Sequence, residues 1–222
     1  MESPSADVLI ETIRTDAAGQ AALWPYHEAR LTHSAHALGF AAVPAGLTDR
    51  IRSAVAACPP HPDFRVRLLF TRQGEATCEA HPLGALAVPA KLAIATRVLG
   101  PCAVLNPQEP LLRHKATYRP WYDAATAWLA QHPDCFDLLF ENEHGALCEG
   151  SRTNVYVLRD GQWLTPDTSA GCLPGTQRAA LLASGRVRVA SLTLADLPHA
   201  QGLRLSNALR GWFDVRLADY SR

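Results

Sequence analysis

Lysine is scarce in this chain of 222 residues: Lys91 and Lys115 stand against nineteen arginines. The sequence has no run of basic residues and its formal net charge is zero, so the composition does not indicate a nucleic-acid binding surface. No stretch approaches the roughly 20 apolar residues that a membrane-spanning helix needs. Neither nucleic acid nor a membrane is therefore an expected partner.

The six cysteines are far apart, and no two of them have the C-x-x-C spacing of zinc sites and redox motifs. The first residues contain neither a basic segment nor a long apolar run, so a secretory signal is not expected. In the cytoplasm thiols stay reduced. We therefore expect a cytoplasmic protein with free cysteines and no metal site.

Hydrophobic residues make up 48% of the chain and charged residues 19%, which is ample for a globular core. Strand-like and helix-like segments are mixed without a β-α-β rhythm, which favours an α+β fold over a doubly wound sheet. Helices are expected at 26–38, 47–58, 118–131 and 176–184, strands at 8–14, 64–71, 136–141, 154–159 and 212–217, and a short strand at 23–24. The proline-rich connector at 100–111 predicts a boundary between a small α+β domain, 1–105, and a larger α+β domain, 106–222.

The rarity of lysine draws attention to Lys115, which lies between the proline-rich connector and an expected helix. Arginine cannot form an imine because its guanidinium stays protonated, whereas a lysine can once burial lowers its pKa. Lys115 is thus a candidate for a covalent bond to an aldehyde. The alternative is a surface lysine at the start of a helix.

A second candidate is Glu149, in a loop of small and hydroxylated residues that leads to the strand beginning at Asn154. Backbone N–H groups in such a loop can keep a carboxylate ionised. An ionised carboxylate is what a pyridine nitrogen needs to stay protonated and act as an electron sink. An exposed glutamate in a polar turn is the alternative.

Two further segments suit an anion. Gly175, Thr176 and Gln177 open an expected helix, where free N–H groups and the helix dipole favour a phosphate. Arg30, on the first expected helix, can bind a phosphate bidentately. Each has a plainer interpretation, as a helix cap and as a solvated arginine.

Taken in order, these segments resemble the class IV aminotransferase family, which comprises the fold-type IV enzymes that bind pyridoxal 5'-phosphate. The resemblance covers nearly the whole chain. It is carried by LIETIR at 9–14, HEARL at 27–31, HKATYR at 114–119, EGSRTNV at 149–155, GCLPGTQR at 171–178 and SNALR at 206–210.

The resemblance implies a two-domain fold like that of D-amino acid aminotransferase, here with a truncated N-terminus, and a homodimer. It implies that Lys115 forms the Schiff base with pyridoxal 5'-phosphate and moves protons at the substrate α-carbon. The same likeness predicts a set of groups that bind the cofactor: Glu149 at the pyridine nitrogen, Arg30, Gly175, Thr176, Gln177, Ser206 and Asn207 around the phosphate, and Asn154.

The family supports two reactions on a small amino-acid substrate. Aminotransferases pass the amino group to a keto acid, whereas 4-amino-4-deoxychorismate lyases release pyruvate and form 4-aminobenzoate for folate synthesis. The short N-terminus, the segment from Arg113 to Asp123 and the SNALRG sequence resemble the lyases. A lyase is therefore expected, and an aminotransferase for D-amino or branched-chain amino acids is the alternative. Arg97 and Arg210 are candidates for binding substrate carboxylates.

A degenerate member of the family that binds the cofactor or a partner without turnover is a third interpretation. The presence of both Lys115 and Glu149 argues against it.

Overall fold

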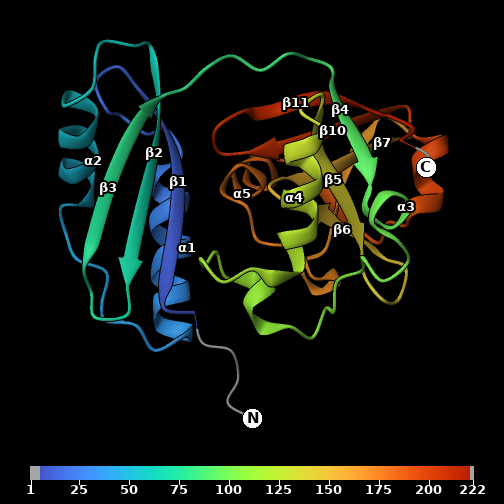
Figure 1. The fold of residues 1–222 in the computed structure, drawn as a ribbon, viewed down its shortest axis with the longest axis horizontal. Coiled ribbons are helices and arrows are strands. Elements are labelled where there is room, and N and C mark those ends of the chain that lie inside the picture. Colours follow the sequence, from blue (N-terminus) through green and yellow to red (C-terminus); the bar gives the residue numbers. More distant parts are fainter. Residues whose placement is uncertain (1–5, 221–222) are drawn as a thin grey trace. The chain divides into compact units, whose positions relative to one another are not determined.

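The computed structural model describes residues 6–220, which form two units (Figure 1). The first unit holds the chain up to Ala85 together with His114–Tyr118, and the second holds Leu86–Arg113 and everything from Arg119 on. The units thus divide at 85/86, and the chain returns briefly to the first unit. The expected domain boundary after residue 105 stays a prediction.

The first unit is an antiparallel sheet, β1-β2-β3, packed against two helices (Figure 1). The elements are β1 (Val8–Asp16), α1 (Trp24–Ala37), α2 (Leu47–Ala56), β2 (Asp63–Thr71) and β3 (Ala76–Pro82). Burial alternates along the strands, so that one face of the sheet packs on the helices and supplies the core. The expected strand at 23–24 was wrong, because Trp24 begins α1 and Pro25 occupies a first-turn position that needs no N–H donor.

Residues 114–118 add a further segment to this sheet, on the free edge of β1. The backbone N–H of Ile10 donates to the Lys115 carbonyl at 2.8 Å, and the N–H of Thr117 donates to the Val8 carbonyl at 3.0 Å. Leu9 forms an antiparallel bridge with Ala116. The lysine singled out by the sequence is therefore held by strand pairing, outside any helix.

The second unit is built on an eight-stranded sheet in the order β10-β11-β4-β5-β6-β7-β8-β9. The additional pairing of β10 with β7 closes six of these strands into a barrel. The strands are β4 (Ala90–Ile94), β5 (Cys135–Glu141), β6 (Leu147–Gly150), β7 (Asn154–Arg159), β8 (Gln162–Pro166), β9 (Arg188–Ala190), β10 (Gly202–Asn207) and β11 (Gly211–Leu217).

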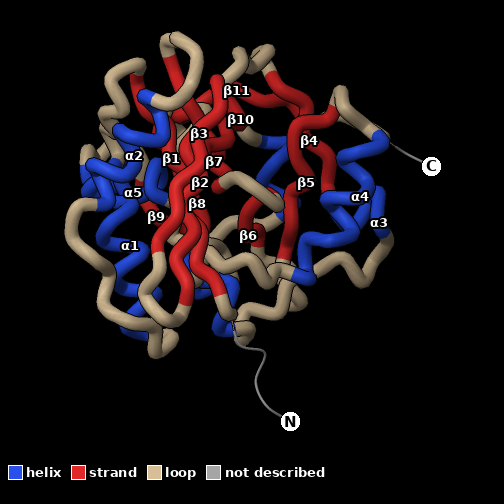
Figure 2. Tube along the Cα trace, turned by 60° about the vertical axis from the view of Figure 1, so that its left-hand side comes forward, coloured by secondary structure: helices blue, strands red, loops and turns tan. Residues whose placement is uncertain are grey.

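Apolar side chains from the strands fill the inside of the barrel, with Leu139, Val155 and Leu205 fully buried there. The helices are α3 (Ala95–Leu99), α4 (Asp123–Gln131) and α5 (Thr176–Ala183), with short 3-10 turns at Pro110–Arg113, Pro120–Tyr122, Thr168–Ala170 and Leu194–His199. Figure 2 shows α3 and α4 beside β4 and β5, and these elements share a second apolar cluster. The outer side of the strands is thus covered as well.

Two sequence expectations in this unit need correction. The helix expected from 118 begins at Asp123, because Pro120 opens a separate 3-10 turn and the residue before a proline avoids helical geometry. Glu149 lies within a strand, β6, where a loop was expected. That strand, LCEG, has only four residues and is too short to show the apolar alternation by which strands are recognised.

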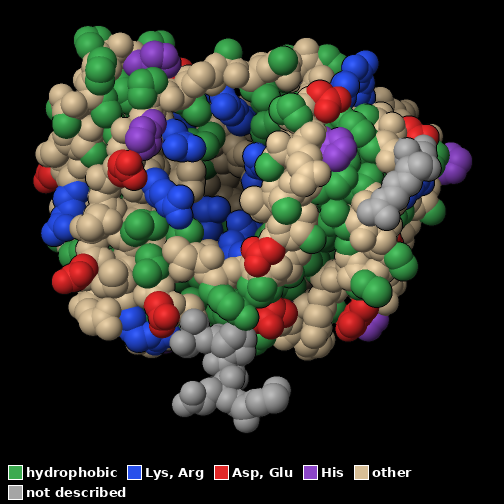
Figure 3. All heavy atoms as spheres, viewed as in Figure 1, with side chains coloured by type: hydrophobic (Ala, Val, Ile, Leu, Met, Phe, Trp, Pro, Cys, Tyr) green, Lys and Arg blue, Asp and Glu red, His purple; other side chains and the backbone are tan. Residues whose placement is uncertain are grey.

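Side chains of both charge signs lie on the face drawn in Figure 3. Acidic side chains are spread over the face drawn in Figure 3 and do not form a single patch. None of the helices among residues 6–220 has the length and apolarity to cross a lipid bilayer.

Candidate active site

Lys115 lies opposite Ile10 of β1 and is partly exposed. Its neighbour Ala116 is buried with Leu9, on the face of the sheet that packs on the helices. The Lys115 charge is near the buried His27, where it adds to the effect of burial in lowering the pKa of that imidazole. His114 points back to the helices, where its Nδ1 lies 2.9 Å from the Ser34 hydroxyl of α1. These contacts fix the backbone on both sides of the lysine.

A buried charge cluster lies on the helix side of β1. The Glu11 carboxylate accepts hydrogen bonds from Arg30 Nε at 2.8 Å and Arg30 Nη2 at 2.5 Å, and it lies 2.6 Å from His27 Nδ1. Burial alone would raise the pKa of Glu11, but the Arg30 charge and the hydrogen bonds from His27 and Arg30 lower it to about 2. One edge of the Arg30 guanidinium, expected to bind phosphate, is therefore fixed by Glu11.

The exposed face of this sheet carries two arginines that sequence reasoning missed. Arg67 lies opposite Thr12 and Arg65 lies opposite Arg14 in the β1–β2 register, so both share the face of Ile10. Both are exposed. The signal in the sequence was their alternation with buried apolar residues in DFRVRLLF. In the β2–β3 register Glu79 lies opposite Arg67, so this face carries charges of both signs.

Glu149 is the buried carboxylate of the second unit, with 3% of its surface exposed. The Tyr122 hydroxyl donates to its Oε1 at 2.7 Å, and Asn154 Nδ2 donates to its Oε2 at 3.3 Å. Burial, and then the negative charge of Glu149, raise the pKa of Tyr122 well above its usual value, so this phenol stays protonated and able to donate. Sequence reasoning assigned no role to Tyr122, although this residue lies within the segment from Arg113 to Asp123 that resembles the family.

Asn154 connects the carboxylate to the segment expected to bind phosphate. Its Nδ2 also donates to the Leu173 carbonyl at 2.9 Å, and a Cβ at Gly175 would collide with its Oδ1. Gly175 directly precedes α5, whose first turn, with Thr176 and Gln177, has no side-chain cap. The backbone N–H groups of such a turn suit an anion.

Ser206 and Asn207 end β10, the strand that pairs with β7. The buried Ser206 hydroxyl lies 2.7 Å from the Tyr156 hydroxyl. Asn207 Oδ1 accepts the backbone N–H groups of Leu209 and Arg210, at 3.1 and 2.9 Å, and so closes the turn to β11. The side chain of Asn207 therefore orders its own loop, and the expected cofactor contact of this residue stays a prediction.

The two arginines proposed for substrate carboxylates lie at separate places in the second unit. Arg97 is exposed on the short helix α3, and Arg210 lies half-buried in the turn between β10 and β11. Their roles remain predictions.

The residues present suit pyridoxal 5'-phosphate. The first unit offers an amine, Lys115, and a guanidinium, Arg30, held by a buried carboxylate. The second offers a buried carboxylate, Glu149, linked through Asn154 to an uncapped helix start at Gly175. The amine can form an imine with the aldehyde of the cofactor, and the carboxylate can pair with its pyridinium nitrogen. The guanidinium and the backbone N–H groups can bind its phosphate.

Comparison with known proteins agrees with this chemistry. The model of the amino-transferase class IV family matches residues 8–218. A protein of Schizosaccharomyces pombe named "Putative aminodeoxychorismate lyase" is 30% identical over 181 residues, which are 81% of this chain and 74% of that protein.

Solved structures resemble the chain along almost its whole length. A "Putative amino-acid aminotransferase" from Mesorhizobium loti has a TM-score of 0.84 and 35% identity, covering 95% of this chain and 99% of that one. The 4-amino-4-deoxychorismate lyase from Pseudomonas aeruginosa shares the fold, with a TM-score of 0.75 and 22% identity over 96% of this chain and 83% of that one. The α+β, fold-type IV prediction is thus confirmed, and the chain is a member of the class IV aminotransferase family, whose enzymes depend on pyridoxal 5'-phosphate.

Proposed function

We propose that this enzyme is a 4-amino-4-deoxychorismate lyase, which forms 4-aminobenzoate and pyruvate for folate synthesis. The observation that carries the proposal is the 30% identity to the Schizosaccharomyces pombe protein along 81% of this chain. A homodimer and a cytoplasmic location accompany the proposal as expectations.

In this reaction the bound cofactor stores the electron pair released at the carbon that bears the amino group. Lys115 removes the proton from that carbon. The pairing of Lys115 with Ile10 fixes the backbone from which the amine side chain extends. Glu149, oriented by Tyr122 and Asn154, holds a proton at the pyridine nitrogen. The ether bond beside the reacting carbon then breaks as the ring becomes aromatic, so the protein has mainly to bind and orient the substrate.

The substrate has carboxylates, and cations must bind them. Arg65 and Arg67 lie exposed on the sheet of the first unit and are in no ion pair among residues 6–220. We add them to Arg97 and Arg210 as candidates for this role.

An aminotransferase is the second candidate, because the Mesorhizobium loti protein of that name is 35% identical over 95% of this chain. Lys115, Glu149 and the phosphate-binding segment serve both reactions equally. The difference lies in the groups that bind the substrate.

An assay of both reactions on one preparation decides between them. The purified protein with pyridoxal 5'-phosphate is incubated with 4-amino-4-deoxychorismate, and 4-aminobenzoate and pyruvate are measured. Parallel reactions contain D-alanine or a branched-chain amino acid with 2-oxoglutarate. We expect 4-aminobenzoate formation, abolished in Lys115→Ala. Keto-acid formation from the amino acids without any 4-aminobenzoate would reject the lyase in favour of the aminotransferase.

A further inference from the structure

A second carboxylate of the β-barrel unit is more deeply buried than Glu149. Asp137, in β5, is fully inaccessible to solvent. No lysine or arginine among residues 6–220 is in ion-pair contact with it; hydrogen-bond donors surround it instead. It accepts from the backbone N–H of Leu138 (2.9 Å), Ser151 (3.0 Å) and Arg152 (3.2 Å), and from the hydroxyls of Ser151 (2.6 Å) and Thr153 (2.7 Å).

Four of these five donors belong to residues 151–153, which connect β6 to β7. Glu149 is the second-last residue of β6 and Asn154 is the first of β7, and the two are paired across the strands. The turn between them closes with a hydrogen bond from the Gly150 N–H to the Thr153 carbonyl, 2.8 Å long. The Asp137 carboxylate thus accepts hydrogen bonds from the N–H and O–H groups of this turn, and the turn holds Glu149 and Asn154 opposite each other.

Gly150 shows how closely this turn packs on the carboxylate. A Cβ at Gly150 would collide with Asp137 Oδ2 and Thr153 Oγ1. Its φ angle is not in the left-handed region, so the requirement for glycine here comes from close approach. The turn could not lie where it does if any other residue stood at this position.

We propose that Asp137 is a positioning residue for Glu149, which sets the place of that carboxylate against the cofactor by fixing the 150–153 turn. The inference rests on the proposed role of Glu149 at the pyridine nitrogen. A purely structural role would stabilise the unit without affecting the bound cofactor, and the experiment below separates the two.

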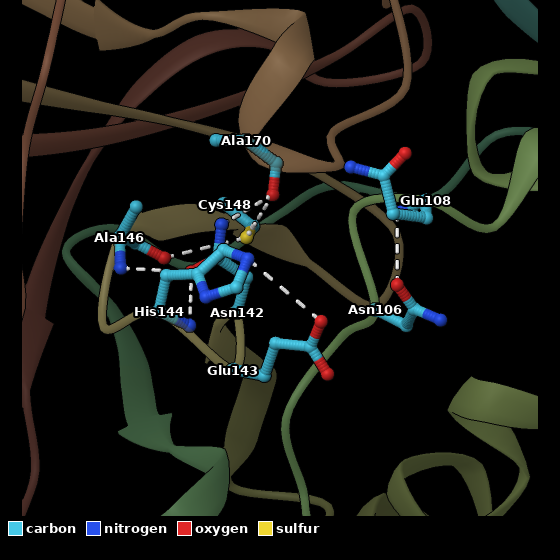
Figure 4. Close-up of polar contacts among 8 residues, drawn as sticks. All are labelled: Asn106, Gln108, Asn142, Glu143, His144, Ala146, Cys148 and Ala170. Atoms are coloured by element: carbon cyan, nitrogen blue, oxygen red, sulfur yellow. Dashed lines mark hydrogen bonds and ion pairs between the residues drawn. The ribbon is translucent and has the colours of Figure 1, made fainter.

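Asn142 provides a matched control at the other end of the same strand. It follows β5, is 4% exposed, and orders a turn in the same way (Figure 4). Its Oδ1 accepts the N–H groups of His144 and Ala146, at 2.9 and 3.0 Å, and its Nδ2 donates to the Ala170 carbonyl at 2.9 Å. This turn connects β5 to β6 and thus lies at the opposite end of β6 from the 150–153 turn.

The test compares Asp137→Asn, Thr153→Ala, Asn142→Ala and, as the reference for loss of the carboxylate, Glu149→Gln. Each variant is titrated with pyridoxal 5'-phosphate by absorbance, and the spectrum of the bound cofactor is recorded as a function of pH together with the melting temperature. Asp137→Asn puts an amide donor against the Arg152 N–H. Thr153→Ala removes one hydrogen bond to Asp137 and tests the same proposal if Asp137→Asn does not fold.

We expect Asp137→Asn to weaken cofactor binding about tenfold and Thr153→Ala about threefold, and both to shift the pH dependence of the spectrum in the direction of Glu149→Gln. Asn142→Ala should lower the melting temperature and leave the spectrum unchanged. A wild-type spectrum in both Asp137→Asn and Thr153→Ala, beside a changed one in Glu149→Gln, would overturn the inference, as would an equal shift in Asn142→Ala. An unchanged spectrum in Glu149→Gln would instead reject the role of Glu149 itself.

Discussion

The most deeply buried carboxylates that the structure describes in the two units, Glu11 and Asp137, are accommodated in different ways. Glu11, in the first unit, lies against the Arg30 guanidinium and the His27 ring. Asp137, in the second, is surrounded by neutral N–H and O–H donors of the turn at 151–153. The charges of Arg30 and the hydrogen bonds outweigh burial and lower the pKa of Glu11 to about 2. Burial outweighs the hydrogen bonds and raises the pKa of Asp137.

The difference reflects what each carboxylate is used for. Glu11 orients the guanidinium that is expected to bind a phosphate, so a charged partner is part of the arrangement. Asp137 holds backbone, and neutral donors suffice for that. The same residue chemistry thus serves to orient a guanidinium in one unit and a turn in the other.

The largest effect should come from breaking the ion pair. Glu11→Gln removes the negative charge of the buried pair with Arg30, and we expect a loss of about 3 kcal/mol in the free energy of unfolding. Urea denaturation measures it. Asp63→Asn is the control, because the Arg14–Asp63 pair joins β1 to β2 at the surface and should contribute less than about 1 kcal/mol. Equal losses in the two variants would contradict the comparison.

The two carboxylates should respond to acid with opposite sign. Because the pKa of Glu11 falls from 4.5 to about 2 on folding, its contribution, on the order of 3 kcal/mol, is present above pH 4.5 and is lost as the pH falls towards 2. The pKa of Asp137 is raised above 3.8, so its ionisation costs stability as the pH rises through that range. Between pH 5 and 3 the stability advantage of the wild type should shrink relative to Glu11→Gln and grow relative to Asp137→Asn. Denaturation series at fixed pH values measure both, and the same sign in both series would rule out this account.

Crowding the turn on Asp137 should have a smaller effect. Gly150→Ala places a Cβ against Asp137 Oδ2 and Thr153 Oγ1, and we expect it to cost about 2 kcal/mol. Gly84 has open space around it and no positive φ, so Gly84→Ala should change stability by less than about 0.5 kcal/mol. Denaturation of the two variants side by side provides the measurement. A neutral Gly150→Ala would show that the turn is not packed on the carboxylate.

The smallest effect is expected from a variant that changes the orientation of Glu149 more than the stability of the protein. Tyr122→Phe removes one donor to Glu149, and we expect about threefold weaker binding of pyridoxal 5'-phosphate with a loss of stability of only about 1 kcal/mol. Tyr220→Phe is the matched control, because this hydroxyl donates to Asp134 at 2.9 Å in the same unit. Absorbance titration gives both affinities. Equal affinities would mean that Tyr122 does not orient Glu149 for the cofactor.

The sequence predicted the α+β class and most elements, because alternation in residues 64–71 and the stripe along α1 are local patterns. It also singled out Glu149 and Asn154, which the structure joins by a hydrogen bond. It misplaced Glu149 in a loop, since the four-residue β6 owes its strand geometry to pairing with its neighbours β5 and β7 and not to a pattern in its own residues.

The residues that hold the site residues in place could not be predicted from the sequence. Asp137 stands within an apolar strand, and a lone carboxylate there indicates a buried polar contact but not which donors it meets. Glu11 and Arg30 are nineteen residues apart and meet because α1 packs on β1. Contacts of this kind depend on tertiary packing, which a single sequence does not contain.

Attachment of the cofactor to Lys115 is the claim on which the rest depends, and the scarcity of lysine makes it directly testable. The protein is incubated with pyridoxal 5'-phosphate, reduced with borohydride and digested, and the modified peptide is identified by mass spectrometry. We predict a single adduct on Lys115, retained in Lys91→Arg and lost in Lys115→Arg; Lys91 pairs with Asp134 at 2.7 Å. An adduct on Lys91, or none on either lysine, would contradict the account.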